Sequence, residues 1–428
     1  MYLLYNLLIY LLTPLILTYF FFRFLIKKRY RFGLMERLGY YPEERISRIT
    51  GKKVIWIHSV SVGEVIASIP LVLELKKRYP DYSLIMSTVT ETGRETAIKK
   101  IPFLNAVVYF PFDLHFSVKN AIDKIKPVVF VMLETEIWPN FLKALRGKGI
   151  PAILINGRIS DRSYKRYLRV RFFIKEVLKN ICVFGMQSNQ DVERIINMGA
   201  VKEMVERTGN LKFEHEARDI SSDAVKKLKE SMNITEDKDI IIAGSTHRGE
   251  DEEVVKAYLT VVKEVKDAIL IIAPRHLDRL PEIEDILKRY NLSFIRKTII
   301  KKGEASSKYH VILLDTIGEL STLYSIASVV FVGGSLVPVG GHNILEPALY
   351  KKPILFGPYM HNFREIAEGF KNRGAAIEVA DSDEMAKEII NILNNPDIGT
   401  KLGERGFSVI VENKGALEKS IGLIGRFL

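Results

Sequence analysis

The chain has 428 residues, which at roughly 100–200 residues per domain predicts two globular domains. Hydrophobic residues make up 47% and charged residues 27%, an ordinary globular composition that excludes a wholly disordered chain. Lys and Arg number 63 against 51 Asp and Glu, and the resulting charge of +12 suits anionic ligands or an anionic surface. The single cysteine, Cys182, excludes an intramolecular disulfide and a cysteine-rich zinc module, and it favours a reducing compartment.

The first segment, Tyr2–Phe22, has no charged side chain and is rich in Leu, Ile, Tyr and Phe. As a helix it would be about 30 Å long, which matches the hydrocarbon thickness of a bilayer. Basic residues follow from Arg23 to Arg37, and positive charge beside an apolar segment favours the cytoplasmic side. We therefore expect a membrane-anchor helix at residues 1–25 and a basic juxtamembrane segment at residues 26–50.

The first segment has two other interpretations. Asn6, Thr13 and Pro14 interrupt its apolarity, as in a helix that lies in the plane of the membrane. A cleaved signal peptide is disfavoured, because the N-terminus lacks a basic region and no cleavage site of small residues follows.

After Gly51, short apolar runs alternate with segments of helical periodicity, such as Val65–Arg78 and Asp191–Met198. The first predicted strands are Val54–Ile57, Leu84–Ser87, Val107–Phe110, Val128–Leu133, Ala152–Ile155 and Ile181–Phe184. The charged segment Glu214–Asp239 holds no convincing strand. The second series of predicted strands is Ile240–Ala243, Ala268–Ala273, Ser293–Arg296, Val311–Leu314, Val329–Val332 and Pro353–Phe356.

Continuous strands rich in Val and Ile that alternate with helices predict parallel sheets covered on both faces. We therefore expect two doubly wound, Rossmann-like α/β domains, at residues 51–218 and 219–412, facing a cleft at the carboxyl ends of their strands. Residues 413–428 have the pattern of an amphipathic helix, which we expect to pack back on the first domain.

Glu64 follows the first predicted strand, in the sequence His58-Ser-Val-Ser-Val-Gly-Glu64. Ser61 and Glu64 have the spacing of a helix capping box, which is a purely structural role. The same position is where α/β folds bind ligands, and a carboxylate there could act as general base toward a hydroxyl. We expect the N-terminus of the helix to favour the ionised carboxylate.

Further charged residues follow other strands of the first domain. Glu134 and Glu136 come directly after the strand that ends at Leu133, and they are either solvated loop acids or groups that hold a lysine or bind substrate hydroxyls. Lys212, in Thr208-Gly-Asn-Leu-Lys-Phe213, is either a surface lysine or the neutralising partner of a carboxylate or phosphate.

The second domain carries small residues and glycines at its strand ends. The segment Ala243–Asp251 would let backbone amides approach a phosphate, but it lacks the spacing of a P-loop. Arg275 is a fixed cation at another strand end. A glycine-rich turn then leads to Asn343 and to Glu346, whose carboxylate could bind a ribose diol. No pattern of zinc ligands occurs, so we predict no metal.

In this order the motifs resemble the 3-deoxy-D-manno-octulosonic acid (Kdo) transferases of lipopolysaccharide synthesis, and the resemblance covers almost the whole chain. Each motif is weak evidence alone, whereas their shared order is strong evidence. The motifs are Leu3-Leu-Tyr, HSVSVGE, ETEIWPN, GNLKF, GSTHRGEDE, APRH, DTIGEL, FVGGSLVPVGGHNILEPA and the segment Gly357–Phe363.

The resemblance implies a GT-B glycosyltransferase with acceptor chemistry in the N-terminal domain and the nucleotide on the C-terminal domain. Glu64 matches the family's general base, and Glu134 and Lys212 match positions that stabilise the transition state. The positions that match the CMP-binding residues are Pro274, Arg275, His276, Ile317, Gly318, Glu319, Asn343, Ile344, Leu345 and Glu346. Ile317 stands where relatives have Met, a small departure at a position expected to contribute backbone.

The resemblance also implies the reaction and the partners. Kdo would pass from CMP-β-Kdo to the lipid A precursor, lipid IVA, with inversion and without a cofactor or metal. The expected place is the cytoplasmic face of the bacterial inner membrane, with the membrane surface as a partner and no nucleic acid.

Three other functions compete with this one. A GT-B enzyme that uses a UDP- or GDP-sugar shares the fold and the glycine-rich turns. A nucleotide-sugar epimerase shares the architecture, although its soluble substrate gives no reason for an apolar N-terminus. A membrane-tethered nucleic-acid-binding module is disfavoured, because neither a helix-turn-helix nor a ribonucleoprotein motif occurs.

Overall fold

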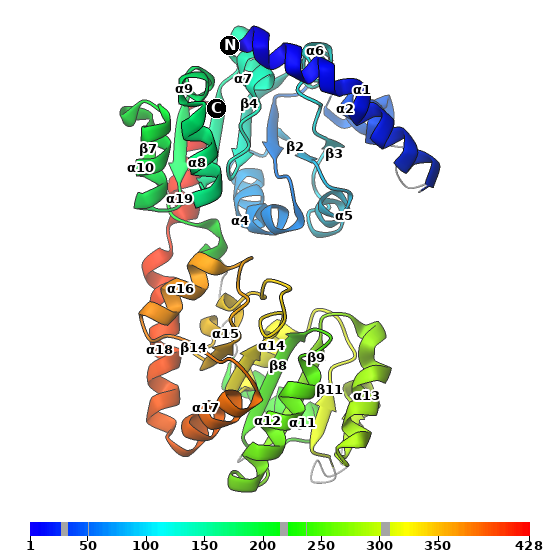
Figure 1. The fold of residues 1–428 in the computed structure, drawn as a ribbon, viewed down its shortest axis with the longest axis vertical. Coiled ribbons are helices and arrows are strands. Elements are labelled where there is room, and N and C mark those ends of the chain that lie inside the picture. Colours follow the sequence, from blue (N-terminus) through cyan, green and yellow to red (C-terminus); the bar gives the residue numbers. More distant parts are fainter. Residues whose placement is uncertain (27–32, 50, 215–220, 237, 301–308) are drawn as a thin grey trace. The chain divides into compact units, whose positions relative to one another are not determined.

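The structure is a computed structural model that describes residues 1–26, 33–49, 51–214, 221–236, 238–300 and 309–428 (Figure 1). The chain forms two compact units, one of Met1–Glu214 with Asn413–Leu428 and the other of His215–Glu412. Residues 27–32, within the expected juxtamembrane segment, and residues 215–220, where a domain boundary was expected, lie outside the described residues.

The first unit is built on a parallel seven-stranded sheet in the order β3-β2-β1-β4-β5-β6-β7. Chain order reverses between the neighbours β1 and β4, and a doubly wound sheet binds ligands beyond the carboxyl ends of the strands at such a point. The strands are β1 (Val54–His58), β2 (Ser83–Thr88), β3 (Ala106–Tyr109), β4 (Pro127–Leu133), β5 (Ala152–Gly157), β6 (Val183–Met186) and β7 (Val205–Arg207).

Helices cover both faces of this sheet. On β1, Trp56 packs in one apolar cluster with Phe141, whereas Ile55 and Ile57 pack in a second cluster with Leu71. Because alternate residues of the strand face opposite apolar layers, the run is apolar without a break. The α-helices are α1 (Tyr2–Ile26), α2 (Gly33–Arg37), α3 (Glu43–Ile46), α4 (Val62–Arg78), α5 (Glu91–Lys100), α6 (His115–Ile125), α7 (Pro139–Gly147), α8 (Asp161–Arg169), α9 (Arg171–Leu178), α10 (Asn189–Met198) and α19 (Ala416–Gly425). The 3₁₀ turns are η2 (Ser47–Ile49), η3 (Lys202–Met204) and η4 (Leu211–Glu214).

No helix within the described residues is long and apolar enough to cross a membrane, so the predicted transmembrane anchor at residues 1–25 is not supported. One face of α1 is instead bound to the rest of the first unit. Tyr5 Oη donates to Asp113 Oδ2 at 2.8 Å, and Asn140 Nδ2 donates to Asn6 Oδ1 at 2.6 Å. Because these contacts occupy one face of the helix, lipid cannot surround it along its first turns.

The opposite face of α1 is a stripe of leucines in the first three turns. These side chains are between 47% and 86% exposed, whereas Tyr2, Tyr5 and Asn6 are half-buried. The stripe, called the leucine stripe below, consists of Leu3, Leu4, Leu7, Leu8, Leu11 and Leu12. This arrangement is the one expected of the alternative interpretation, a helix that lies along a surface.

The second unit has a parallel seven-stranded sheet in the order β10-β11-β9-β8-β12-β13-β14. Its chain order reverses between β8 and β12, so the two strands form the second point at which a ligand is expected. The strands are β8 (Ile240–Thr246), β9 (Ile269–Pro274), β10 (Phe294–Arg296), β11 (Val311–Leu313), β12 (Val329–Val332), β13 (Ile354–Phe356) and β14 (Ile377–Glu378).

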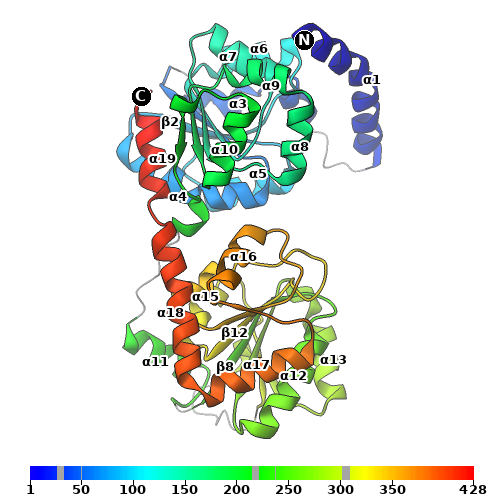
Figure 2. The same ribbon diagram turned by 60° about the vertical axis from the view of Figure 1, so that its left-hand side comes forward.

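The α-helices of the second unit are α11 (Ser222–Ser231), α12 (Asp251–Glu264), α13 (Leu280–Arg289), α14 (Leu320–Leu323), α15 (Leu345–Leu349), α16 (Arg364–Asn372), α17 (Ser382–Asn394) and α18 (Pro396–Asn413). The 3₁₀ turns are η5 (Leu277–Arg279), η6 (Lys297–Ile299) and η8 (Tyr324–Ile326). The C-terminal helix α19 packs on the first unit beside α4 (Figure 2). Ile421 and Ile424 of α19 lie in the same apolar cluster as Leu71.

Candidate active site

Glu64 lies in the first turn of α4, beyond the carboxyl end of β1, and its side chain is 9% exposed. Its Oε2 accepts the Val60 amide at 2.7 Å, and its Oε1 accepts the Ser61 hydroxyl at 3.0 Å. Ser61 is the N-cap residue, but its side chain makes no capping bond, and Glu64 accepts the amide of Val60 and not that of Ser61, so the expected capping box does not form.

Burial is the main reason that the pKa of Glu64 is raised to about 7, and the negative charge of Glu134 adds to it. The two hydrogen bonds to Glu64 act in the opposite direction and are outweighed. This corrects the expectation that the helix N-terminus keeps the carboxyl in its usual acidic range. A carboxyl with a pKa near neutrality accepts a proton better than an ordinary glutamate does.

Glu134 directly follows β4, which is the neighbour of β1 in the sheet. Its amide continues the sheet by donating to Ile155 O at 3.0 Å, and its φ of 57° is an uncommon, left-handed value for a residue other than glycine. A backbone held in this way fixes the direction in which the chain leaves the strand. The negative charge of Glu134 raises the pKa of both Glu64 and Glu136, so the three carboxyl groups form one cluster.

Glu136 is the member of this cluster that the resemblance does not single out. Its Oε2 accepts Nε1 of Trp138 at 3.0 Å. Burial raises its pKa to about 7, with a further contribution from Glu134. The sequence signal for Glu136 is its place in Glu-Thr-Glu directly after a buried strand, which did not distinguish it from a solvated loop acid.

Lys212 lies in η4, which follows β7 and packs against α4, the helix of Glu64. The turn is held by Asn156 at the end of β5, whose Oδ1 accepts the Leu211 amide at 2.9 Å. The Lys212 amide donates to Asn210 Oδ1 at 2.9 Å. The structure therefore places Lys212 on an element that contacts the helix of Glu64.

In the second unit, the fully buried carboxylate of Glu250 binds four backbone amides. Its Oε2 accepts from His247 at 2.8 Å and from Gly334 at 2.6 Å. Its Oε1 accepts from Ser335 at 2.9 Å and from Leu336 at 2.8 Å. These amides of the glycine-rich turn are thus bound to a protein carboxylate, and they are not presented to a phosphate.

Two histidines meet at the point where the strand order of the second sheet reverses. His247 follows β8, and His342 lies at the end of the glycine-rich turn that follows β12. Their Nε2 atoms are 2.8 Å apart, and the planes of the two rings differ by 7°. The ring of His276 lies 5.9 Å from that of His247. Burial lowers the pKa of both members of the pair, that of His342 to about 4.

The predicted nucleotide residues of the second unit lie beyond the carboxyl ends of three strands. Pro274 ends β9, and the exposed Arg275 and His276 follow it. The segment Ile317–Glu319 follows β11, with Ile317 84% exposed, and Ile344 and Leu345 are buried at the start of α15.

Two of these acids already have partners in the protein. Glu319 binds Lys297 Nζ with both carboxylate oxygens at 2.8 Å and also accepts the Thr316 hydroxyl. Asn343 Nδ2 donates to Glu346 Oε1 at 3.2 Å. Gly318 has a φ of 94°, so this turn needs a residue without a Cβ.

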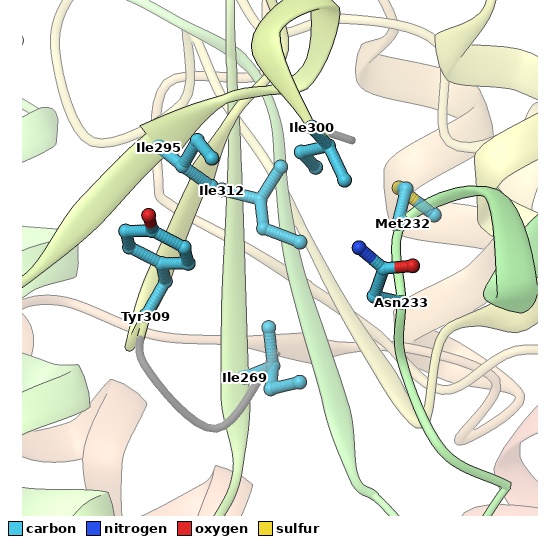
Figure 3. A pocket seen from close by; sticks show the side chains of 7 residues that line it. All are labelled: Met232, Asn233, Ile269, Ile295, Ile300, Tyr309 and Ile312. Carbon is cyan, nitrogen blue, oxygen red and sulfur yellow. The ribbon is translucent and has the colours of Figure 1, made fainter. Parts of the chain in front are cut away.

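A pocket in the second unit lies elsewhere and is apolar (Figure 3). Ile269, the first residue of β9, lines it, whereas Arg275 follows the other end of that strand. Among the described residues that line it there is no carboxylate, histidine, lysine or arginine, and we assign the pocket no part in the chemistry. The lining residues are Met232, Asn233, Ile269, Ile295, Ile300, Tyr309 and Ile312. Across the described ranges no group of three or more candidate metal ligands occurs, and the absence of a metal requirement stays a prediction.

The family model described as 3-deoxy-D-manno-octulosonic-acid transferase (kdotransferase) matches residues 33–215. A 3-deoxy-D-manno-octulosonic acid transferase of Haemophilus influenzae is 34% identical over 419 residues, which are 97% of this chain and 96% of that protein. A bifunctional glycosyltransferase/methyltransferase of Fusobacterium nucleatum is 40% identical over 85% of this chain, and the match spans only 57% of that protein.

A solved structure supports the fold. The crystal structure of a glycosyltransferase from Rickettsia africae is similar over 88% of this chain and 99% of that chain, with a TM-score of 0.56. At 15% identity this likeness concerns the fold alone, and the two seven-stranded α/β units accordingly resemble those of GT-B glycosyltransferases. With the full-length relative, these comparisons show that the chain is a glycosyltransferase that belongs to the 3-deoxy-D-manno-octulosonic acid transferase family.

Proposed function

We propose that this enzyme transfers Kdo from CMP-β-Kdo to a hydroxyl group of lipid IVA, with Glu64 as the general base. The observation that carries the proposal is the state of Glu64. It is a buried carboxyl with a pKa of about 7, held by two hydrogen bonds at the strand-order reversal of the first sheet. This is the position and the proton affinity that a base for an alcohol needs.

In the proposed step, the acceptor oxygen attacks the anomeric carbon of Kdo while Glu64 takes the hydroxyl proton. The new carbon–oxygen bond forms as the bond to the phosphate oxygen breaks, and CMP leaves with the bonding electron pair. Attack from the face opposite to the leaving group converts the β-linked donor into an α-ketoside, so the configuration inverts.

The second unit is proposed to hold CMP at the carboxyl ends of β8, β9, β11 and β12. Arg275 is exposed directly after β9 and can balance the phosphate charge without a metal. Glu346, held by Asn343, is the candidate partner of the ribose hydroxyls. Glu134 and Lys212 are proposed to stabilise the charges that develop at the acceptor side.

The acceptor is a lipid, so the enzyme has to work at a membrane surface. We propose that the leucine stripe of α1 lies in the membrane interface on the cytoplasmic face of the bacterial inner membrane. The six exposed leucines provide the apolar area, and the chain's charge of +12 favours an anionic surface.

The direct test is to incubate the protein with CMP-Kdo and lipid IVA and to read the product by mass. E64Q should keep CMP binding and lose transfer by a factor of about 10²–10⁴. The substitution keeps the local contacts, because the Gln oxygen can accept the Val60 amide while the Ser61 hydroxyl turns to accept the new NH₂ group.

The matched control is E74Q, which makes the same change on the same helix at a residue bound to Arg78 on the surface. E74Q should transfer Kdo at the wild-type rate. Near-normal transfer by E64Q would remove Glu64 from the mechanism. Stabilisation of the wild type by UDP or GDP and not by CMP would instead favour a different sugar nucleotide.

A further inference from the structure

The two segments that carry the histidine pair of the second unit are held together by one buried carboxylate. Glu250 accepts the amide of His247 and the amide of Gly334, which begins the part of the turn that leads to His342. Gly340 and Gly341 of that turn have φ values of 116° and 74°. The turn thus brings His342 Nε2 to 2.8 Å from His247 Nε2.

A separation of 2.8 Å between two ring nitrogens requires a proton between them, donated by one ring and accepted by the other. The accepting ring then carries its own proton on Nδ1, so the neutral pair holds two protons. The Nδ1 of the donating ring can take a third proton, which makes the pair cationic.

The surroundings of the pair are positive. Arg275 and His276 follow β9, and Arg279 of η5 is also near enough to lower the pKa of His247. Desolvation and these neighbours disfavour the third, charging proton on the pair in the free enzyme. Asp251 acts in the opposite direction on the pKa of His247, and its carboxylate is already bound to Arg279.

Other charged groups near the pair are bound to partners of their own or lie further from it. Arg248 binds Glu282 on the surface. His361 lies beside Gly340, and the carboxylate of Glu250 is saturated by four amides. The pair thus faces mainly cations, and an anion bound there would reverse the sign of the local field.

We propose that the His247–His342 pair takes up one proton from solvent when the phosphodiester of the donor nucleotide binds beside it. The inference rests on the proposed function, since it takes the donor to be a cytidine nucleotide held at this strand-order reversal. Anion binding and protonation then favour each other by the same factor, because the two equilibria are linked. The cationic pair would help to hold the negative charge that grows on the leaving phosphate.

The test measures the affinity of the full-length enzyme for the methyl phosphodiester of CMP between pH 5.5 and pH 8.5 by titration calorimetry. This probe carries one fixed negative charge over the whole range, so any pH dependence belongs to the protein. In the wild type, the Kd should increase with rising pH, and the increase should approach about tenfold per pH unit.

Three variants identify the group that takes the proton. The double variant H247Q, H342Q should bind more weakly and show less than about twofold change per pH unit. H276Q, which removes the neighbouring histidine, should keep the slope of the wild type. H310Q is the matched control, since His310 is bonded to Ser293 away from the pair, and it should keep both the affinity and the slope.

Each outcome decides a separate point. A wild type that binds no cytidine phosphodiester at any pH would overturn the proposed donor, and with it the premise of this inference. A wild type that binds with a pH-independent Kd would overturn the proton uptake alone. A slope that survives in the double variant, or that disappears in H276Q, would assign the proton to another group and equally refute the role of the pair.

Discussion

Replacing Glu64 by Gln should make the fold more stable at alkaline pH while it abolishes transfer. The pKa of this carboxyl is raised from the ordinary value of 4.5 to about 7, chiefly by burial. A raised pKa means that the neutral carboxyl stabilises the fold at low pH and that this stability is lost as the pH rises through about 7. Gln is neutral at every pH and escapes that loss.

The magnitude follows from the size of the shift. The rise from 4.5 to about 7 corresponds to about 3.5 kcal/mol at about 1.4 kcal/mol per pH unit, which is an upper value for the gain of E64Q at pH 8. For a unit of some two hundred residues this raises the unfolding temperature by at most about 7–14 °C. At pH 4.5 the gain should vanish, because the wild-type carboxyl is then protonated in the folded protein.

The assay is thermal unfolding of wild type, E64Q and the control E74Q from pH 4.5 to pH 8.5. Glu74 lies on the same helix, and its pKa is lowered by its hydrogen bond with Arg78, so E74Q should show no alkaline gain. Equal unfolding temperatures of E64Q and wild type at pH 8.5 would show that the ionised Glu64 carboxylate does not destabilise the fold. The argument for a base of neutral pKa would then fail.

Three other predictions follow from single contacts. In S61A, loss of the hydroxyl that Glu64 accepts should move the acidic limb of the kcat/KM profile from near pH 7 to higher pH, by up to about one unit. If the acidic limb stays at the same pH in S61A, Glu64 is not the group that the limb reports. In E250Q, loss of amide partners in the glycine-rich turn should raise the KM for the donor at least about tenfold, and a change in kcat alone would contradict this. Changing Leu3, Leu7 and Leu11 to Ser should release the protein from anionic vesicles in a sedimentation assay. If the variant stays bound, the leucine stripe is not the membrane-binding surface.

The central strands could be predicted from the sequence because burial on both faces leaves an unbroken apolar run. The prediction Val54–Ile57 differs from β1 by one residue, and Val329–Val332 coincides with β12. The short edge strands have no such apolar run. β14 has only two residues, and neither they nor the three of β7 are buried, so no apolar run marks these edge strands.

The candidate site was predictable in its residues but not in its contacts. Glu64, Glu134 and Arg275 stand in the sequence beside the strands that carry them, so the doubly wound pattern alone places them at strand ends. The bonds that Glu250 makes to residues more than eighty positions away, and the meeting of His247 with His342, are long-range. They depend on which strands become neighbours, and periodicity does not encode that order.

The first segment shows why a hydropathy pattern can mislead. Its apolar residues are numerous enough to suggest a span, but the polar groups of its first two turns recur at helical spacing and lie on a single face. Tyr2, Tyr5 and Asn6 lie on that face and find partners on the first unit. The spacing of the polar residues, more than the mean apolarity, was the informative feature.

In the proposed mechanism, Glu64 unites two roles that the sequence presents as alternatives. The capping position fixes the direction of the carboxylate, because the Val60 amide and the Ser61 hydroxyl each hold one oxygen. On an exposed helix the same bonds would lower the pKa and leave a weak base. Burial against the sheet and the nearby charge of Glu134 reverse that effect. The bonds therefore supply orientation and the burial supplies proton affinity, so structural and catalytic roles require the same residue at the same place.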